Sequence, residues 1–114
     1  MDGPALTREY YRSIDAADYE TLESLLAEGF VHERPDRTLS GRDRFVEFMR
    51  EERPETDTEH VLDAVYSTEA GGRVAAEGRL LRADGEVWFG FVDTFDIDGG
   101  AIADIQTYTD EHPL

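Results

Sequence analysis

The sequence predicts a single α+β domain in which helices cover one face of a curved antiparallel sheet. Three observations support this prediction. The chain has 114 residues, which suits one hydrophobic core and is too short for two. Its first half carries apolar residues at helical spacing, and its second half is divided into four strand-like segments by turns that contain glycine. We therefore expect residues 1–114 to form one domain.

The first half of the chain contains signals for two helices in succession. Asp2 and Pro4 suit a helix start, and Asp18 can cap a second, shorter helix that Gly29 is expected to close. The apolar residues of the first helix recur at helical spacing: Leu6, Tyr10, Ile14 and Ala17. Tyr11 is displaced from this stripe, so we expect it at the surface or at an interface.

A short strand and a third helix are expected next. Residues 30–34 read as a strand that Pro35 stops. The segment from Ser40 to Asp43 is similar to a capping box, with aspartate in place of the usual glutamate or glutamine. It predicts the start of a helix that ends before Pro54.

The second half of the chain is expected to form an antiparallel meander. The predicted strands are 58–69, 73–82, 86–97 and 101–109, and hairpin signals such as Asp84-Gly85 separate them. In the third of these strands, the face that bears Trp88 and Val92 is also mostly uncharged. A sheet face of this kind favours a partner, and a homodimer through it is the simplest arrangement.

The charge balance is strongly acidic. The chain has 27 Asp and Glu residues against 11 basic residues, all of them arginine, and a net charge of −16. Because molar salt shortens the Debye length to about 3 Å and screens this repulsion, we expect a protein from the high-salt cytoplasm of a halophile; an ordinary acidic protein is the alternative. An acidic surface disfavours nucleic acid. The sequence shows no membrane span or signal peptide, and without cysteine it has no disulfide or thiolate chemistry.

Asp93 is the strongest candidate for a functional residue. Every second residue from Val87 to Ile97 is apolar except Asp93. A carboxyl group among apolar side chains loses hydration, which raises its pKa and favours the neutral acid. Such an acid could donate a hydrogen bond to a ligand oxygen or serve as a general acid. Alternatively, Asp93 is a structural acid bonded to a backbone amide, to Tyr10 or to an arginine such as Arg79.

His32 and Arg34 share a face of the first predicted strand with Phe30. His32 could be a base that works near neutral pH, and Arg34 could clamp an anionic group. In the alternative interpretation Arg34 pairs with Glu33 or Asp36 at the strand end, and His32 is half-exposed.

The order of elements resembles the cone-shaped nuclear transport factor 2-like superfamily, especially its SnoaL-like polyketide cyclase and ketosteroid isomerase branch. The stretches that carry the resemblance are LTREYYRSIDAADYETLESLLAEGFVHERP, TLSGRDRFVEFM and FGFVDTFDIDGGAIADIQTYTD. The resemblance implies three helices packed on the concave face of the sheet and a mainly apolar pocket for a small molecule. The absence of a phosphate loop or dinucleotide motif predicts that no cofactor is needed.

The resemblance also implies roles for individual residues. A first-helix tyrosine and a late-strand acid hydrogen-bond the substrate oxygen in the isomerases, and Tyr10 and Asp93 match them. The general base of the isomerases falls at Arg34, which cannot abstract a proton. The predicted catalytic set is therefore Asp93 as acid, Tyr10 as its partner and His32 as base. The predicted ligand contacts are Arg34, His60, Tyr66, Phe91, Phe95 and Thr107.

Three functions remain open from the sequence. The first is a cofactor-free isomerase, cyclase or dehydratase that acts on a small apolar carbonyl compound. The second is a ligand-binding or dimerisation module without turnover. The third is an enzyme similar to epoxide hydrolases, in which Glu77 and Arg79 handle water, although Thr107 occupies the place of the second acid. His32, His60 and His112 show no metal-ligand spacing, so no metal is expected.

Overall fold

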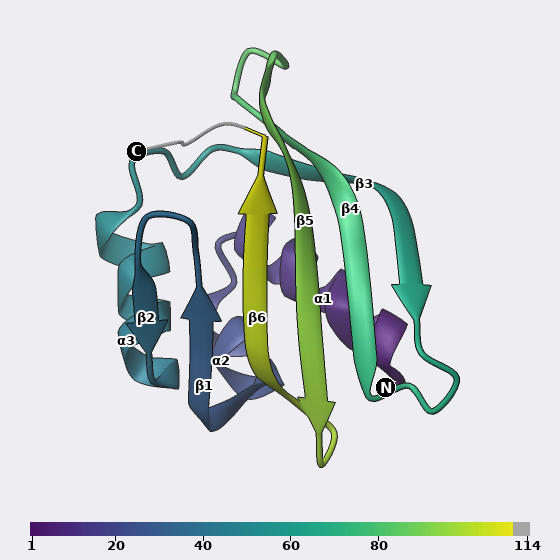
Figure 1. Cartoon of the computed structure of the whole chain (residues 1–114). Helices are drawn as coiled ribbons and strands as arrows, with labels where there is room; N and C mark the ends of the chain where they lie inside the picture. Colours follow the sequence, from purple (N-terminus) through teal and green to yellow (C-terminus); the bar gives the residue numbers. More distant parts are fainter. Residues whose placement is uncertain (111–114) are drawn as a thin grey trace.

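The computed structural model describes residues 1–110, so His112 lies outside the described part of the chain. Helices pack on one face of a six-stranded sheet (Figure 1). In chain order the elements are α1 (Gly3–Asp15), α2 (Tyr19–Leu25), β1 (Leu26–Glu33), β2 (Thr38–Ser40), α3 (Arg42–Glu47), the π-helical turn η1 (Phe48–Glu52), β3 (Glu59–Ser67), β4 (Arg73–Leu81), β5 (Val87–Asp98) and β6 (Ala101–Thr109). Within residues 1–110, no helix is both long enough and apolar enough to cross a membrane.

The strand order is β2-β1-β6-β5-β4-β3 (Figure 1). Strands β3 to β6 form the predicted antiparallel meander. Strand β1 pairs with β6 in parallel, with His32 opposite Ile105, so the sheet is mixed and the expectation of an entirely antiparallel sheet is wrong. A parallel pair needs a long connection between its strands, and here α3 and the other strands of the meander provide it.

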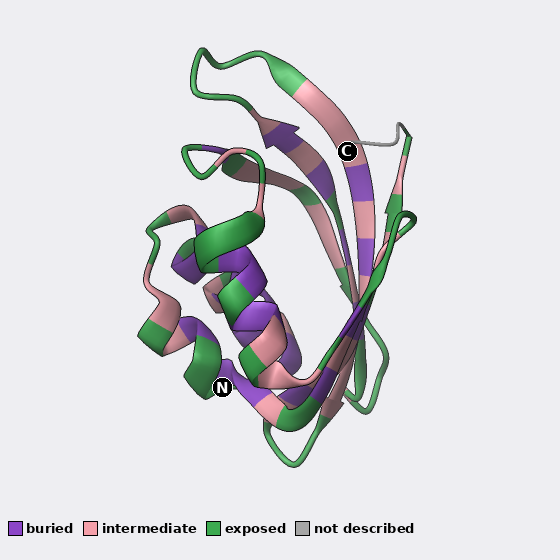
Figure 2. Ribbon diagram, turned by 90° about the vertical axis from the view of Figure 1, so that its left-hand side faces the viewer, coloured by how far each residue is buried: buried purple, intermediate pink, exposed green. Residues whose placement is uncertain are grey.

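The sheet curves around the helices, which lie on its concave face as predicted (Figure 2). The buried side chains gather between the two layers, and Phe30, Phe45 and Phe95 are among the fully buried ones. Gly3 allows the start of α1 to approach the sheet closely, because a Cβ atom there would lie 2.9 Å from a methyl group of Val74. The core therefore lies between the helices and the concave face of the sheet.

The first two helices begin at the predicted caps. The side chain of Asp2 accepts a hydrogen bond from the Ala5 amide at 2.8 Å, and Asp18 accepts one from Thr21 at 3.2 Å. The predicted end of the second helix is wrong, because Leu26 is already extended and begins β1. Gly29 therefore lies inside β1.

The predicted capping box does not form. Ser40 ends β2, and the residue before α3 is Gly41, which makes no side-chain cap and has a φ of 96°. A left-handed backbone at this position suits glycine, so Gly41 turns the chain from the short strand into the helix.

A β-bulge in β5 changes the direction of one large side chain. Leu80 of β4 pairs with Phe89, and Leu81 pairs with Val87, which leaves Trp88 as the extra residue. A bulge interrupts the alternation of side chains between the two faces of a strand. Trp88 consequently lines the pocket on the helix side, and its expected place on the outer face beside Val92 is wrong.

A second bulge lies in β3 at Asp63. Leu62 pairs with Gly78 and Ala64 pairs with Glu77, so no residue of β4 stands opposite Asp63 in the strand pairing. The residues after the bulge change faces. Tyr66, which was expected on the inner face with His60, is 58% exposed and lies on the outer face.

Candidate functional site

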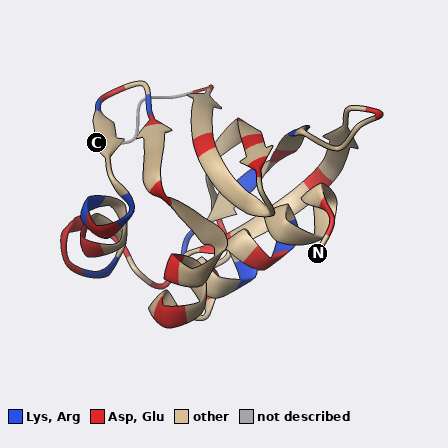
Figure 3. Ribbon diagram, turned by 90° about the horizontal axis from the view of Figure 1, so that it is seen from below, with Lys and Arg blue, Asp and Glu red and all other residues tan. Residues whose placement is uncertain are grey.

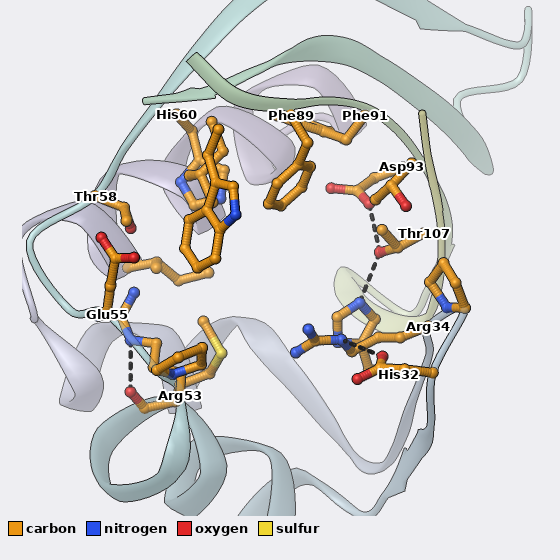
Figure 4. Close-up of a pocket in the computed structure, with 18 of the residues that line it drawn as sticks. His32, Arg34, Arg53, Glu55, Thr58, His60, Phe89, Phe91, Asp93 and Thr107 are labelled. Carbon is orange, nitrogen blue, oxygen red and sulfur yellow. Dashed lines mark hydrogen bonds and ion pairs between the residues drawn. The ribbon is translucent and has the colours of Figure 1, made fainter. Parts of the chain in front are cut away.

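A pocket of about 120 Å³ opens between the helices and the concave face of the sheet (Figure 4). This volume is of the order of an engineered cavity that holds benzene, so it suits a molecule with about one ring. The apolar part of the wall consists of Ile14, Pro35, Met49, Pro54, Leu80, Trp88, Phe89 and Phe91. The titratable side chains in the wall are Tyr10, His32, Arg34, Asp36, Arg53, Glu55, His60 and Asp93.

Asp93 lies in this wall as predicted and is only 6% exposed. The Tyr11 hydroxyl donates to its Oδ2 at 2.5 Å, and the Thr107 hydroxyl lies 2.5 Å from its Oδ1. Burial raises the pKa of Asp93, and the two hydrogen bonds lower it by less. No arginine among residues 1–110 forms a hydrogen bond or ion pair with it: Arg79 pairs with Asp63 on the outer face at 2.8 Å, and Arg34 lowers the pKa of Asp93 only through its charge. Burial therefore shifts the carboxyl towards its neutral form, in the direction that the sequence suggested.

The hydrogen-bond partner of Asp93 is Tyr11, and the expectation that Tyr11 lies at the surface is wrong. Tyr11 is 3% exposed because α1 buries a stripe wide enough to include Gly3 and Thr7. Those two residues precede Tyr11 at a spacing of four, which is the signal that would have predicted its burial. Burial raises the pKa of Tyr11 well above 10, so its hydroxyl keeps its proton.

Tyr10 also lines the pocket, but its hydroxyl has no hydrogen-bond partner among residues 1–110.

Thr107 connects Asp93 with His32, because its Oγ1 lies 2.7 Å from His32 Nε2 (Figure 4). His32 is 7% exposed. Burial, reinforced by the charge of Arg34, lowers the pKa of His32 to about 3. The imidazole is neutral at physiological pH, and the expectation of a base that titrates near neutral pH is wrong.

The position of the proton on His32 decides the direction of the hydrogen bonds in this network. His32 Nδ1 is buried and has no partner within the described residues. An unpaired buried N–H is rarer than an unpaired acceptor, which favours the proton on Nε2, where it is donated to Thr107. Thr107 can then accept from His32 and donate to one carboxyl oxygen of Asp93, while Tyr11 donates to the other.

His60 lines the opposite part of the pocket and is held by Asp15 at the end of α1. Asp15 Oδ2 accepts from the His60 amide at 2.9 Å, and Oδ1 lies 2.6 Å from His60 Nδ1. The imidazole packs against Tyr11 and Phe91, with ring centroids 4.9 and 5.7 Å away. The sequence singled out His60 but missed Asp15, because nothing local connects residues 45 positions apart.

A protein-family model described as a SnoaL-like domain matches residues 7–105 of the chain. The chain belongs to the SnoaL-like domain family. The family resemblance found in the sequence is thereby confirmed, and so is the α+β fold that it implied. No curated protein shows significant similarity to this SnoaL-like domain.

Solved structures share the fold over nearly the whole SnoaL-like domain. One is a candidate ketosteroid isomerase from Kribbella flavida, with 22% identity, a TM-score of 0.84, and coverage of 98% of this chain and 80% of that one. Another is a candidate polyketide cyclase from Pseudomonas putida, with 25% identity, a TM-score of 0.77, and coverage of 95% and 91%. A third is an LEH-like epoxide hydrolase from M. tuberculosis, with 17% identity, a TM-score of 0.78, and coverage of 95% and 82%.

Arg34 combines the two interpretations that the sequence left open. It lines the pocket of the SnoaL-like domain, and it also forms an ion pair with Asp36 at 3.3 Å. Its guanidinium lies 5.2 Å from the ring centroid of Phe48. Arg34 is thus partly neutralised before any ligand binds.

The sequence did not single out Arg53, which lines the same pocket and donates to the Met49 carbonyl at 2.7 Å.

Of the predicted ligand contacts, Phe95 and Tyr66 lie outside the pocket, whereas Phe91 and Thr107 line it. Phe95 is fully buried in the core behind the pocket wall. Tyr66 donates from the outer face to Glu77 at 3.0 Å. Glu77 is therefore also on the outer face, as is Arg79, and the proposed Glu77–Arg79 pair does not face the pocket.

Metal binding finds no ready site in the part of the chain that the structure describes. No three His, Asp or Glu side chains there are grouped closely enough to hold a metal ion. The polar groups of the pocket are instead distributed around an apolar wall, which is an arrangement suited to orienting an organic molecule.

Proposed function

We propose that this SnoaL-like domain binds a small, mainly apolar molecule through one oxygen atom and catalyses acid/base chemistry on its carbonyl group without a cofactor. The observation that carries the proposal is the buried carboxyl of Asp93 in the wall of an apolar pocket. A neutral acid in such a site can donate a hydrogen bond to an oxygen on which negative charge develops. Isomerisation, cyclisation and dehydration of carbonyl compounds all create such an oxygen.

The network around Asp93 supports this role. Tyr11 and Thr107 hold both carboxyl oxygens, so the group is oriented before a ligand arrives. A donor that is already in place needs no reorganisation during the reaction. We propose that Tyr10 contacts the ligand from the pocket wall and that His32 positions Thr107, since its low pKa makes it a weak base.

The names of two relatives favour the same chemistry. The candidate ketosteroid isomerase and the candidate polyketide cyclase are named for reactions of carbonyl compounds. Epoxide hydrolysis has less support, although one relative bears that name. Glu77 and Arg79, the residues considered for it, lie outside the pocket.

The test measures deuterium exchange at the carbon next to the carbonyl of three ketones in deuterium oxide: cyclohexanone, acetophenone and β-tetralone. The unaltered protein should accelerate exchange of at least one of them. Asp93→Asn keeps the shape but loses the acidic proton, so exchange should fall to the buffer rate. Affinity for the same ketone should stay within about tenfold, or roughly 1.4 kcal/mol.

Glu77→Gln is the matched control, because it removes a carboxylate from the outer face and should leave exchange unchanged. A protein that shifts the ketone signals on binding but never exceeds the buffer exchange rate would be a binding module without turnover. Asp93→Leu should destabilise the fold by about 1–3 kcal/mol in either case, since it leaves the buried Tyr11 hydroxyl without its acceptor.

We further propose that the protein is a homodimer through the outer face of the sheet. Val92 lies on this face, directly paired with Tyr108 of β6. Tyr108 and Tyr66 are 51% and 58% exposed, which is unusual for large side chains on a sheet. Trp88 has no part in this surface, because it lines the pocket.

We also propose that the protein works in the cytoplasm of a cell that keeps molar salt. The net charge of −16 and the use of arginine for all 11 basic residues support this. Acidic residues are spread over helices, strands and loops, so their repulsion acts on the whole fold (Figure 3).

A further inference from the structure

On the basis of the proposed function, we infer that His60 is the general base of this pocket and that Asp15 positions it. His60 Nε2 takes a proton from the carbon next to the ligand carbonyl, while Asp93 binds the carbonyl oxygen. The ligand class that follows is an enolisable ketone of about one ring. Neither residue has a catalytic role in the set predicted from the sequence.

The contacts with Asp15 determine the orientation of His60 and the place of its proton. Asp15 Oδ1 lies 2.6 Å from Nδ1, and Oδ2 accepts from the His60 amide at 2.9 Å. A carboxylate only accepts hydrogen bonds, so Nδ1 carries a proton, and in the neutral form of the ring Nε2 keeps its lone pair. The second contact joins Asp15 to the backbone of β3, which prevents the ring from moving away from its partner.

The free nitrogen of His60 is available to a ligand. Nε2 has no hydrogen-bond partner among residues 1–110, and the side chain is 15% exposed and lines the pocket. The rings of Tyr11 and Phe91 pack against the imidazole and hold it in place. A neutral imidazole with one nitrogen bonded to a carboxylate and the other facing a pocket is the arrangement that general bases use.

The base and the acid are spaced for one small molecule. The Tyr11 ring packs against His60, and the Tyr11 hydroxyl reaches Asp93 at 2.5 Å, so about one tyrosine side chain separates the two groups. In Figure 4 they lie on opposite sides of the pocket with Phe89 between them. A ketone whose oxygen lies at Asp93 can therefore bring its neighbouring C–H group to His60.

The step is balanced without any further reactant. His60 Nε2 takes the proton, and the electron pair of the C–H bond becomes the C=C bond of the enol. The π pair of the carbonyl moves to the oxygen, which takes the proton of Asp93. His60 is then an imidazolium beside the Asp15 carboxylate, and Asp93 is a carboxylate. In the reverse step the enol proton goes back to Asp93, and the imidazolium, after exchange of its proton with solvent, returns a deuteron to the same carbon, which gives exchange. Return to a conjugated carbon of an unsaturated ketone gives an isomer.

The experiment compares His60→Gln, Asp15→Asn and the control Glu9→Gln in the deuterium-exchange assay with the same three ketones. His60→Gln should reduce the catalysed exchange by about a hundredfold or more, which is the usual effect of a general base. Asp15→Asn should reduce it and change its pH profile, because the asparagine does not stabilise the imidazolium. Glu9→Gln removes a carboxylate from the exposed side of the same helix and should have no effect.

A second measurement reads the proton position directly in the unaltered protein. Nitrogen-15 spectra of His60 should show the proton on Nδ1, and Asp15→Asn should shift the population towards Nε2. A proton on Nε2 in the unaltered protein would overturn the inference even if His60→Gln fails to fold.

The outcomes also separate the inference from the proposed function. If His60→Gln keeps the exchange that Asp93→Asn loses, the dyad is only a structural link between α1 and β3, and the proposed function stands. If the unaltered protein exchanges none of the three ketones faster than buffer, the proposed function and the assignment of His60 both fail.

Discussion

Tyr11 and Asp93 are 82 positions apart in the chain, and the Tyr11 hydroxyl donates to Asp93 Oδ2 at 2.5 Å. This contact joins α1 to β5 inside the layer of buried side chains. It links the element that begins the fold to the strand that carries the candidate acid. The Thr107 hydroxyl on β6 holds the other carboxyl oxygen, so three elements meet at one carboxyl group.

Carbon-13 titration of the Asp93 carboxyl should give a pKa above the ordinary value, because burial outweighs its hydrogen bonds. The folding stability that Asp93 contributes is fully present below its ordinary pKa, which is that of the unfolded chain. This contribution is lost as the pH rises through the raised pKa of the folded protein. Tyr11→Phe removes a donor that favours the carboxylate, so the pKa should rise further and the fold should lose about 1–2 kcal/mol. Tyr10→Phe is the control and should leave the pKa of Asp93 nearly unchanged. A lowered Asp93 pKa would contradict the neutral acid.

His32 should remain neutral throughout the range from about pH 5 to 8, because burial lowers its pKa to about 3. The unfolded chain binds the proton near pH 6.5, so folding stability should rise with pH between the two values and be lost as the pH falls. The total change in the free energy of unfolding over this pH range should be on the order of a few kcal/mol. His32→Gln should flatten this part of a denaturation series measured at several pH values. A His32 ring signal that titrates near pH 6.5 would rule out the buried neutral form.

Gly78 should not tolerate a side chain. An added Cβ atom would lie 2.3 Å from the Val61 carbonyl oxygen and 3.1 Å from the Phe91 ring. Gly78→Ala should therefore destabilise the fold by about 1–3 kcal/mol, as overpacking does elsewhere. Gly72→Ala is the matched control, since nothing lies within 4 Å of its Cβ position. Equal denaturation midpoints for the two variants would show that β3 can move aside.

Sedimentation in molar salt should give twice the monomer mass. Val92→Asp places a charge on the outer face of the sheet and should shift the equilibrium towards monomer, because burying an unpaired charge is costly. Thr38→Asp, on the short edge strand β2, should leave the dimer intact. A monomer in the unaltered protein would refute the proposed interface.

Thermal unfolding should depend strongly on salt. With a net charge of −16, the acidic side chains repel one another in dilute buffer. Molar potassium chloride should screen this repulsion and so raise the midpoint temperature of unfolding. The measurement is a melting series from dilute buffer to molar salt, with sucrose at matched concentrations as a control for general stabilisation. A flat response to salt would remove the case for a salt-loaded cytoplasm.

The sequence predicted most of the fold because its signals are local. Asp2 and Asp18 cap the helices that follow them, and the hairpin turns separate the strands of the meander at the expected places. The burial of Asp93 was also predictable, because a two-residue period assigns every side chain of a regular strand to one face. The sequence prediction placed Trp88 and Tyr66 on the wrong faces. The direction of each side chain is changed by a one-residue bulge, and no pattern in the strand predicts such a bulge.

By itself the sequence determined the α+β class, the N-terminal caps of the first two helices, the meander and an acid that faces inward, because each depends on residues close together in the chain. Only the tertiary structure decided that β1 joins β6 in parallel, that Tyr11 binds Asp93 and that Asp15 holds His60. These contacts join segments far apart in the chain. Their partners are selected by how the layers pack, and packing depends on the shape of the whole core.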